Sequence, residues 1–444
     1  MLYQFHEDDL EQATLEWLEE LGYETLHGPD IAADGEYPER ASYQEVVLYD
    51  RLEEALRKIN PSASSHSIER AIQLVTMIES PSLIVNNRNF QKYVTDGIDV
   101  EYRTEDGRNA TEKLWLFDFE HMNHNNFLAV NQLTVIEGQN NKRPDVVVFV
   151  NGLPLVVIEL KSSTNEQAGI TEAFHQIQTY KRAIPSLFNY NAFLVISDGV
   201  NARAGSLTAN EERFMMWRTE DGETIAPTSN PQLETLLRGM FKHEVLLDIL
   251  RHFVLFQTDG EHTFKIVAAY HQYYAVNKAV EQAKRASSAE GDRKIGVIWH
   301  TQGSGKSLSM VFFTGKLVLE LDNPTIVVLT DRNDLDDQLY GTFSMSIDLL
   351  RQTPKQAETR SDLKDLLAVE SGGIIFTTMQ KFAPDEGSST MDALTERKNV
   401  IVMADEAHRT QYGFQAEIQK GNSTVAAKYG YAKYMRDALP NASF

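Results

Sequence analysis

The sequence has 444 residues, of which 42% are hydrophobic, so two or three globular domains with substantial cores are expected. It contains no Cys, which excludes disulfides, thiolate catalysis and thiolate metal sites and fits a cytoplasmic protein, and no apolar run is long enough to span a bilayer. The net charge of −22 argues against a protein that coats nucleic acid indiscriminately. The charge is uneven, because residues 1–50 hold 14 of the acids and a single base, Arg40, so local basic surfaces for DNA are compatible with the rest of the chain.

The first half of the chain predicts a mixed α/β domain that ends near residue 218. Short segments rich in β-branched residues follow one another from about residue 98 to 160, and residues 191–199 read as a buried strand. The spacing of apolar residues predicts helices over 8–22, 45–59, 67–80 and 168–184.

The second half of the chain predicts alternating strands and helices. Residues 219–232 are rich in Gly, Pro, Ser, Thr and Asn and are the best linker in the sequence, and a long apolar helical stretch follows over 233–257. Apolar strands are predicted at 294–300, 325–330, 372–378 and 399–405. Nearly continuous apolar strands separated by helices indicate a parallel sheet covered on both faces.

Charged residues end two of the predicted core strands in KRPDVVVFVNGLPLVVIELKSS, residues 142–163. Asn-Gly is a strong turn signal, and a three-residue loop at 151–153 would place Asp145 directly opposite Glu159. The alternation of side chains along a strand puts Lys161 on the same face. Two opposed carboxylates repel one another unless a cation lies between them, and Mg²⁺ prefers such oxygen ligands.

Two simpler interpretations stay open at this point. Asp145 could merely begin a strand and Glu159 and Lys161 could be its solvated end, because Glu-x-Lys is common and a loop of two or four residues would break the register. Gln176 and Tyr180 lie four residues apart on one predicted helical face, which by itself describes ordinary helix surface.

Together these residues resemble the PD-(D/E)xK nuclease superfamily, through Pro144-Asp145, Glu159-Leu160-Lys161 and the Gln-x-x-x-Tyr helix. The resemblance implies Mg²⁺-dependent hydrolysis of DNA, with Asp145 and Glu159 as metal ligands and Lys161 near the attacking water. It also implies that Gln176 and Tyr180 lie near the DNA backbone. An additional N-terminal acid often joins such a site, and the sequence offers Glu11 and Glu16 without selecting one.

A phosphate-binding loop is predicted in WHTQGSGKSL, between the strand at 294–299 and a helix. Gly303 and Gly305 would let backbone N–H groups turn toward phosphate, Lys306 would reach the β- and γ-phosphates, and Ser307 would ligate Mg²⁺. Thr301 and Ser304 complete the predicted nucleotide-binding set. His300 stands where the strict pattern has its first Gly.

A second nucleotide signal is NVIVMADEAHRTQ, in which an apolar strand ends in Asp405-Glu406-Ala407-His408. A carboxylate at that strand end can hold Mg²⁺ through water, and the next one can polarise the attacking water. A solvated acidic turn explains this segment poorly once the phosphate-binding loop is considered with it.

These features resemble superfamily 2 helicases and translocases of the DEAH type. The resemblance implies that Gln272 reads adenine and that Arg332 and Thr378 contact the phosphates of nucleic acid. From the residues alone, Gln272 is better explained as a polar residue of an amphipathic helix, and Arg332 and Thr378 equally fit ordinary strand-end turns.

The succession of the two motif sets resembles the restriction (motor) subunit of type I restriction-modification enzymes. It implies a mixed-sheet PD-(D/E)xK domain at 1–218, a connection at 219–257 and a RecA-like parallel-sheet lobe at 258–444. It further implies ATP- and Mg²⁺-dependent translocation on double-stranded DNA, cleavage by the nuclease domain, and assembly with modification and specificity subunits in the cytoplasm.

The sequence stops at Phe444, before the Thr-Gly-Thr-Pro segment and the second RecA-like lobe that this family pattern contains. We therefore expect this chain to bind ATP–Mg²⁺ weakly and to hydrolyse it slowly or not at all, since the arginine of a second lobe is needed. An ATP-gated DNA-binding or interaction protein with idle nuclease residues is the alternative. A metabolic P-loop kinase fits poorly, because Asp-Glu-Ala-His has no role there.

Overall fold

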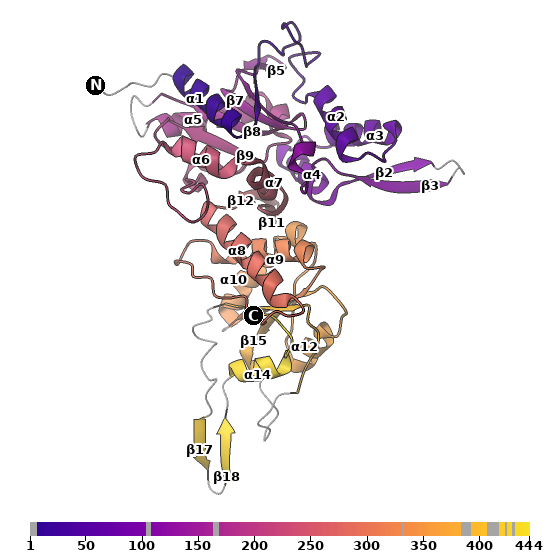
Figure 1. Cartoon of the computed structure of the whole chain (residues 1–444), viewed down its shortest axis with the longest axis vertical. Coiled ribbons are helices and arrows are strands. Elements are labelled where there is room, and N and C mark those ends of the chain that lie inside the picture. Colours follow the sequence, from indigo (N-terminus) through magenta and orange to yellow (C-terminus); the bar gives the residue numbers. More distant parts are fainter. Residues whose placement is uncertain are drawn as a thin grey trace. The chain divides into compact units, whose positions relative to one another are not determined.

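The computed structural model describes residues 7–103, 108–162, 168–330, 333–382, 392–405, 417–421, 424–428 and 431–444. The chain forms two compact units, Met1–His271 and Gln272–Phe444 (Figure 1). Within the described residues, no helix is long and apolar enough to cross a membrane.

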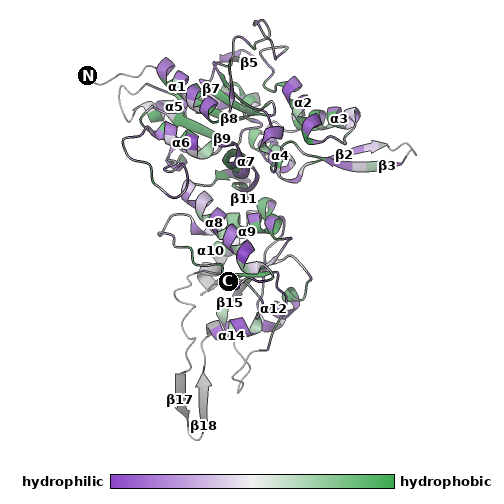
Figure 2. Cartoon of the chain, in the orientation of Figure 1, coloured by the Kyte–Doolittle hydropathy of each residue, from purple (hydrophilic) through white to green (hydrophobic). Residues whose placement is uncertain are grey.

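The first unit is built on a six-stranded mixed sheet with the order β1-β4-β7-β8-β9-β10. Its strands are β1 (Glu24–His27), β4 (Phe127–Asn131), β7 (Val146–Val150), β8 (Leu153–Leu160), β9 (Phe193–Ser197) and β10 (Ala202–Gly205). The pairs β1–β4 and β8–β9 are parallel, and the other three neighbouring pairs are antiparallel. Every residue of β7, β8 and β9 is buried, which explains why these segments are almost continuously apolar (Figure 2).

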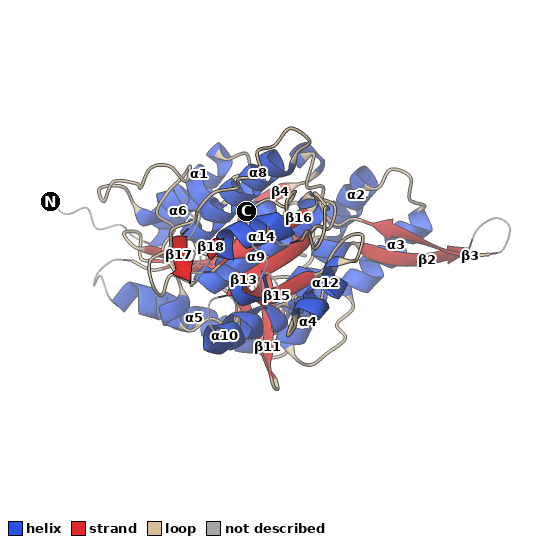
Figure 3. Cartoon of the chain, turned by 90° about the horizontal axis from the view of Figure 1, so that it is seen from below, coloured by secondary structure: helices blue, strands red, loops and turns tan. Residues whose placement is uncertain are grey.

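The described part of the first unit contains seven α-helices, which Figure 3 draws in blue together with those of the second unit. They are α1 (Glu7–Glu20), α2 (Tyr49–Ile59), α3 (Ser65–Thr76), α4 (Leu83–Asp96), α5 (Ala168–Ala183), α6 (Gln232–Met240) and α7 (His243–His252). Three further strand pairs complete the unit: β2 (Ile98–Arg103) with β3 (Asn109–Leu114), β5 (Val135–Glu137) with β6 (Asn140–Lys142), and β11 (Val254–Asp259) with β12 (His262–Val267). Helix α1 packs through Leu10, Thr14 and Leu18, which recur every four residues.

The hairpin of β7 and β8 reaches the predicted register by an unexpected route. Its turn contains two residues, Asn151 and Gly152, both with positive φ, so the predicted three-residue loop at 151–153 is wrong. The register shifts by one residue between Val148 and Phe149, where a β-bulge leaves one extra residue in β8. This extra residue makes up for the shorter turn, and beyond the bulge Val146 pairs with Ile158. The register predicted for the end of the hairpin that carries Asp145 and Glu159 is therefore confirmed.

The second unit contains a parallel sheet with the order β14-β15-β13-β16. Its strands are β14 (Lys355–Gln356), β15 (Ile374–Thr378), β13 (Thr325–Thr330) and β16 (Val400–Ala404). The helices are α8 (Tyr270–Ser287), α9 (Lys306–Glu320), α10 (Asn333–Ser344), α11 (Ile347–Leu350), α12 (Arg360–Leu367) and α14 (Tyr431–Ala438). A separate antiparallel pair joins β17 (Glu417–Gly421) and β18 (Thr424–Lys428). A mixed-sheet domain followed by a parallel-sheet domain confirms the predicted fold class.

Two predicted elements are wrong. Residues 294–300 form no strand: Val297 and Trp299 are 84% and 89% exposed, and the backbone bond from Ile295 N–H to the Phe444 carbonyl ties only one end of the segment. The physical reason is pairing, because Ser443, rather than this segment, bonds to the backbone of β16 at Val400 and Val402. The stretch 233–257 is not one helix but α6, α7 and the start of β11.

The predicted domain boundaries at 218 and 257 stay predictions. Helices α6 and α7 belong to the first compact unit, where α6 contacts α1 and α7 contacts α4. The predicted linker is not a free spacer, since Thr219 is buried and the Lys242 ammonium donates to the Glu220 carbonyl.

Candidate functional site

The first candidate site lies where β7 begins and β8 ends. Asp145 immediately precedes β7, and its Oδ2 accepts a hydrogen bond from the Leu160 backbone N–H at 2.7 Å. The Lys161 ammonium contacts Glu159 Oε1 at 2.9 Å and also donates to the Leu160 carbonyl at 2.8 Å. The structure thus brings Asp145, Glu159 and Lys161 together.

Glu159 is an unusually situated carboxylate. It is 1% exposed, and its Oε2 has no hydrogen-bond partner among the residues that the structure describes. Burial, and then the charge of Asp145, raise the pKa of Glu159 to about 8, although Lys161 acts in the opposite direction. A buried charge with an unsatisfied oxygen is costly unless a further cation compensates it.

Asp145 shares this environment. Burial raises the pKa of Asp145 to about 6, and the nearby acids Glu11 and Glu7 contribute to the same rise. Glu11 is held toward the site because its carboxylate accepts hydrogen bonds from the side chains of Asn131 and Gln132. Glu16 instead lies exposed and accepts a bond from Gln12.

The sequence did not separate Glu11 from Glu16, and the signal that distinguishes them lies at the end of β4. Asn131 pairs with Val146, and the Gln132 N–H donates to the Asp145 carbonyl at 2.9 Å. Two amide side chains, one at the last residue of a buried strand and one just after it, therefore fix the position of Glu11 beside Asp145. Glu7 also approaches the site, with its Oε1 3.9 Å from the Lys161 ammonium.

Helix α5 contributes Tyr180 to the floor of this site. Tyr180 is 3% exposed and its hydroxyl donates to the Arg143 carbonyl at 3.3 Å. Burial, and then the neighbouring Glu159, raise the pKa of Tyr180 above its usual range, whereas a side-chain bond with Gln176 lowers it. The four-residue spacing therefore joins Gln176 and Tyr180 on one helical face beside Glu159, with Gln176 only half-buried.

The donor set fits a hard divalent cation. Asp145, Glu159 and Glu11 offer only carboxylate oxygens, and the unpartnered Oε2 of Glu159 is an acceptor without a donor among the described residues. Mg²⁺ binds such oxygens and retains several of its waters.

The second candidate site lies at the N-terminus of α9. Gly303 and Gly305 adopt φ of 81° and 82°, the left-handed region that glycine occupies without strain, and the helix begins at Lys306. The Lys306 ammonium contacts Asp405 Oδ1 at 2.5 Å, so the loop and the end of β16 meet as predicted. Ser307 occupies the first turn of α9, where backbone N–H groups and the helix dipole favour a phosphate.

The residues around this loop support its shape. The Gln272 side chain is 4% exposed and donates to the Gly305 carbonyl at 3.1 Å, so it lies against the loop rather than on an outer helix surface. Ser304 donates to the Thr301 carbonyl at 2.7 Å and lies 3.1 Å from His300 Nδ1. His300, at the position where the strict pattern has Gly, is thus a local partner of the loop.

Three predicted site residues remain: Thr378, Arg332 and Glu406. Thr378 lies at the edge of the parallel sheet that also carries Asp405. Thr378 ends β15 and pairs with Thr330, the last residue of β13, and the Asp405 N–H donates to the Leu329 carbonyl. Parallel strands end at one edge, so Thr378 and Asp405 share it. Arg332 and Glu406 lie outside the described residues.

Comparisons with known proteins agree with this division into two sites. Residues 4–213 match the family of the type I restriction enzyme R protein N terminus, and residues 271–444 match the SWI2/SNF2 ATPase family. The first match contains Asp145, Glu159 and Lys161, and the second contains the phosphate-binding loop and Asp405.

Individual relatives extend over both regions. The chain is 48% identical to the HindI type I restriction enzyme endonuclease subunit of Haemophilus influenzae over 99% of its own length. It is 35% identical, over 98% of its length, to a Methanocaldococcus jannaschii protein provisionally named as the MjaIXP endonuclease subunit. It is 31% identical, over 72% of its length, to the SsaAORF53P endonuclease subunit of Staphylococcus saprophyticus. The chain spans only 42%, 41% and 33% of the lengths of these three relatives.

The raised pKa of Glu159 predicts how stability depends on pH without metal. Since folding favours the neutral form, this group stabilises the fold most below its unfolded pKa near 4.5, and the contribution is lost as pH rises through about 8. Between about pH 5.5 and about pH 8.5, wild type should lose on the order of 3 kcal/mol more of its unfolding free energy than Glu159→Gln.

The measurement is chemical unfolding in EDTA followed by Trp fluorescence, because Trp17, Trp115 and Trp217 report on the first unit and only Trp299 on the second. Glu16→Gln, which changes an exposed acid of the same unit, is the control and should behave as wild type. Parallel pH profiles for wild type and Glu159→Gln would contradict the prediction.

The ion pair between Lys306 and Asp405 predicts the behaviour of the second site. Lys306→Ala should weaken the binding of Mg²⁺–ATP at least about tenfold, because a charge-assisted phosphate contact is lost. Binding of a fluorescent ATP analogue measures this. Lys284→Ala is the control, since Lys284 pairs with Glu281 and Glu320 elsewhere in the same unit. Equal affinities for wild type and Lys306→Ala would exclude this loop as the nucleotide site.

Proposed function

Because this chain belongs to the family of type I restriction enzyme endonuclease subunits, we propose that its first unit cleaves DNA with Mg²⁺ and that its second binds ATP for translocation. The single observation that carries the nuclease proposal is the convergence of Asp145 and Glu159 in a buried site beside Lys161, with one Glu159 oxygen left unpartnered among the described residues.

Asp145 and Glu159 would hold the metal ion, and Glu11, whose charge contributes to the raised pKa of Asp145, would bind one of its waters. A metal ion at this position supplies an activated water and neutralises charge on the scissile phosphate. In the reaction, the water oxygen would bond to phosphorus as the bond from phosphorus to one ester oxygen breaks, and the departing oxygen would take up a proton from solvent while the attacking water loses one. Lys161, which bridges Glu159 and the strand end, would donate to the attacking water or to a phosphate oxygen.

Helix α5 supports this arrangement in two ways. Tyr180 is nearly inaccessible and lies against Glu159, so we assign it to positioning that carboxylate rather than to contacting DNA. Gln176 lies one turn earlier, is half-buried, and remains the candidate for a contact with the DNA backbone.

At the second site, Lys306 would exchange its partner Asp405 for the β- and γ-phosphates of ATP. Asp405 would then hold Mg²⁺ through water, together with the Ser307 hydroxyl. We assign Gln272, which lies on α8 beside the loop, to recognition of the adenine. We further assign Glu406 to the activation of the attacking water. Arg332 and Thr378 would contact nucleic acid.

The wider activity follows from the family. We propose that the protein works on double-stranded DNA in the cytoplasm, with ATP-driven translocation coupled to cleavage. Its partners would be a modification and a specificity subunit, the latter supplying sequence recognition. The relatives are themselves named as endonuclease subunits, which implies assembly with other chains.

Cleavage is tested by the nicking of supercoiled plasmid by the chain, alone and assembled with its modification and specificity subunits. Nicking should require Mg²⁺, and Asp145→Ala or Lys161→Ala should reduce its rate at least about a hundredfold, because each removes an interaction with the reacting groups. EDTA should abolish it.

A matched pair of variants tests the third carboxylate. Glu11→Gln should raise the Mg²⁺ concentration needed for half-maximal nicking several-fold, roughly 1 kcal/mol of metal binding, whereas Glu16→Gln should leave it unchanged. Nicking by the assembled enzyme that is unaffected by Asp145→Ala and Lys161→Ala would place the nuclease elsewhere and favour a DNA-binding protein with idle nuclease residues.

A further inference from the structure

A second group of potential metal ligands lies in the loop between β3 and β4. Asp118, His121 and His124 recur every three residues, and one ligand atom of each lies within 4.8 Å of the others. None of them belongs to the carboxylate site described above. Unlike that site, this group offers two imidazole nitrogens, which suit zinc and its neighbours in the periodic table better than Mg²⁺.

The distances within the group are close to those of a tetrahedral site. Asp118 Oδ2 lies 2.8 Å from His124 Nδ1 and 3.5 Å from His121 Nδ1. Ligands about 2.0–2.1 Å from a tetrahedral Zn²⁺ stand about 3.3 Å apart, between these two values. The two imidazole rings are stacked, with centroids 5.1 Å apart and an interplanar angle of 26°. A shared ion must lie in the plane of both rings, so the exposed ring of His121 would rotate about its side-chain bonds when the ion binds.

The carboxylate of this group is fixed in place. Its Oδ1 accepts bonds from the N–H groups of Glu120 and His121 at 2.9 and 2.8 Å, which leaves Oδ2 for the imidazoles.

The surrounding loop is anchored to the core by two asparagines. Asn125 receives a bond from the Asp118 N–H at 3.0 Å and donates to the Asp118 carbonyl at 2.8 Å. Asn151, in the β7–β8 turn, donates to Asn125 Oδ1 and accepts from the Asn126 N–H. This second layer restrains Asp118 without using any of the ligand atoms, as support for a metal site requires.

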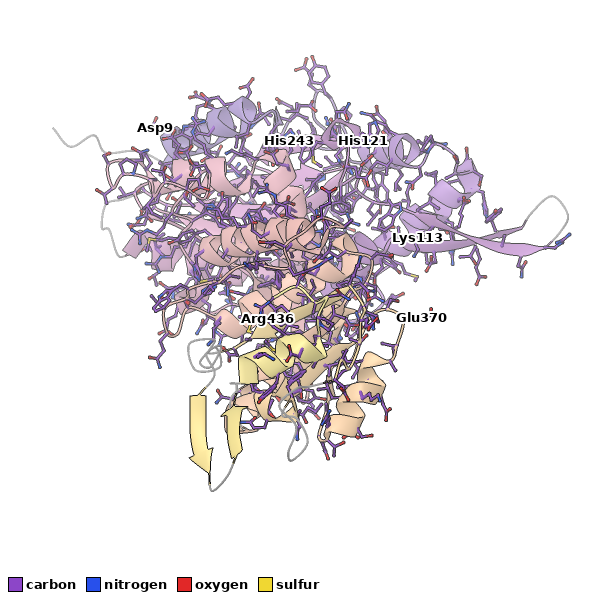
Figure 4. All side chains as sticks on the ribbon, turned by 60° about the horizontal axis from the view of Figure 1, so that its bottom comes forward. Asp9, Lys113, His121, His243, Glu370 and Arg436 are labelled. Carbon is purple, nitrogen blue, oxygen red and sulfur yellow. The ribbon has the colours of Figure 1, made fainter. Side chains whose placement is uncertain are left out.

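The group is separate from the nuclease site. It precedes Phe127, which pairs with Val150, whereas the nuclease acids lie at the other end of β4, where Asn131 pairs with Val146. Four residues of β4 alone separate the two ends by about 13 Å. In Figure 4 the labelled His121 and the labelled Asp9 of α1 lie far apart across the first unit.

We propose that Asp118, His121 and His124 form a Zn²⁺ site that braces the β3–β4 loop, with Nδ1 of each imidazole as ligand and water at the remaining position. His121 is 63% exposed and its side-chain ion pair with Asp118 is long, so an ion can enter from solvent. Binding through Nδ1 of His124 would require the tautomer that carries the ring proton on Nε2, in place of a hydrogen bond from Nδ1 to Asp118. The proposal is independent of the nuclease function.

The test is titration calorimetry with ZnCl₂ on untagged chain that has been stripped with a chelator. All variants carry Asp145→Ala, so that carboxylates of the nuclease site do not obscure the signal. This background should bind one equivalent of Zn²⁺, and excess Mg²⁺ should not compete. Adding His121→Ala should weaken binding at least about tenfold, while adding His66→Ala, which removes an exposed histidine of α3, should have no effect.

Because His121 is exposed, His121→Ala should fold as wild type does, and far-ultraviolet circular dichroism of each variant verifies its fold. A spectroscopic readout adds independent evidence, since Co²⁺ in a tetrahedral nitrogen and oxygen site gives visible absorption that His121→Ala should abolish. Absence of Zn²⁺ binding in the Asp145→Ala background, or equal affinities with and without His121→Ala, would overturn the proposal.

Discussion

The site in the first unit depends on one constraint: two carboxylates are held at the ends of neighbouring strands that are otherwise wholly apolar. Burial of β7 and β8 stabilises the sheet, and it also carries Glu159 to a position where only 1% of the residue is exposed. Asp145 and Tyr180 approach the same carboxylate from β7 and α5. Burial removes water from these acids, so an isolated negative charge on either of them is unfavourable. A cation shared by the two carboxylates would stabilise their charged forms.

The sequence predicted this juxtaposition because strand alternation and an Asn-Gly turn are local signals. The predicted register is correct although the predicted turn is not, since a two-residue turn and one bulged residue together equal the expected three-residue loop. The helices at 168–183 and 306–320 and the glycines of the phosphate-binding loop were also predictable from local pattern.

Other features depend on contacts between distant segments and could not be predicted in that way. Glu11, rather than Glu16, lies near the carboxylate site because the side-chain amides of Asn131 and Gln132 bind it. These residues are more than a hundred positions away in the sequence. The apolar composition of 294–300 predicted a strand, but strand formation needs a neighbouring backbone, and Ser443 bonds to β16 instead. The link between Lys306 and Asp405 agrees with the motif spacing, yet only the folded sheet shows that they meet.

The bulge in the β7–β8 hairpin has a consequence for how this hairpin can vary during evolution. Turn length and bulge compensate for one another, so an insertion at Asn151-Gly152 is harmless only if the extra residue in β8 is lost at the same time. Either change alone would shift β8 by one residue and exchange its two faces, turning Glu159 away from Asp145. The two positions should therefore covary as a single unit, and exchange of complete hairpins between homologues should succeed where exchange of the turn alone fails.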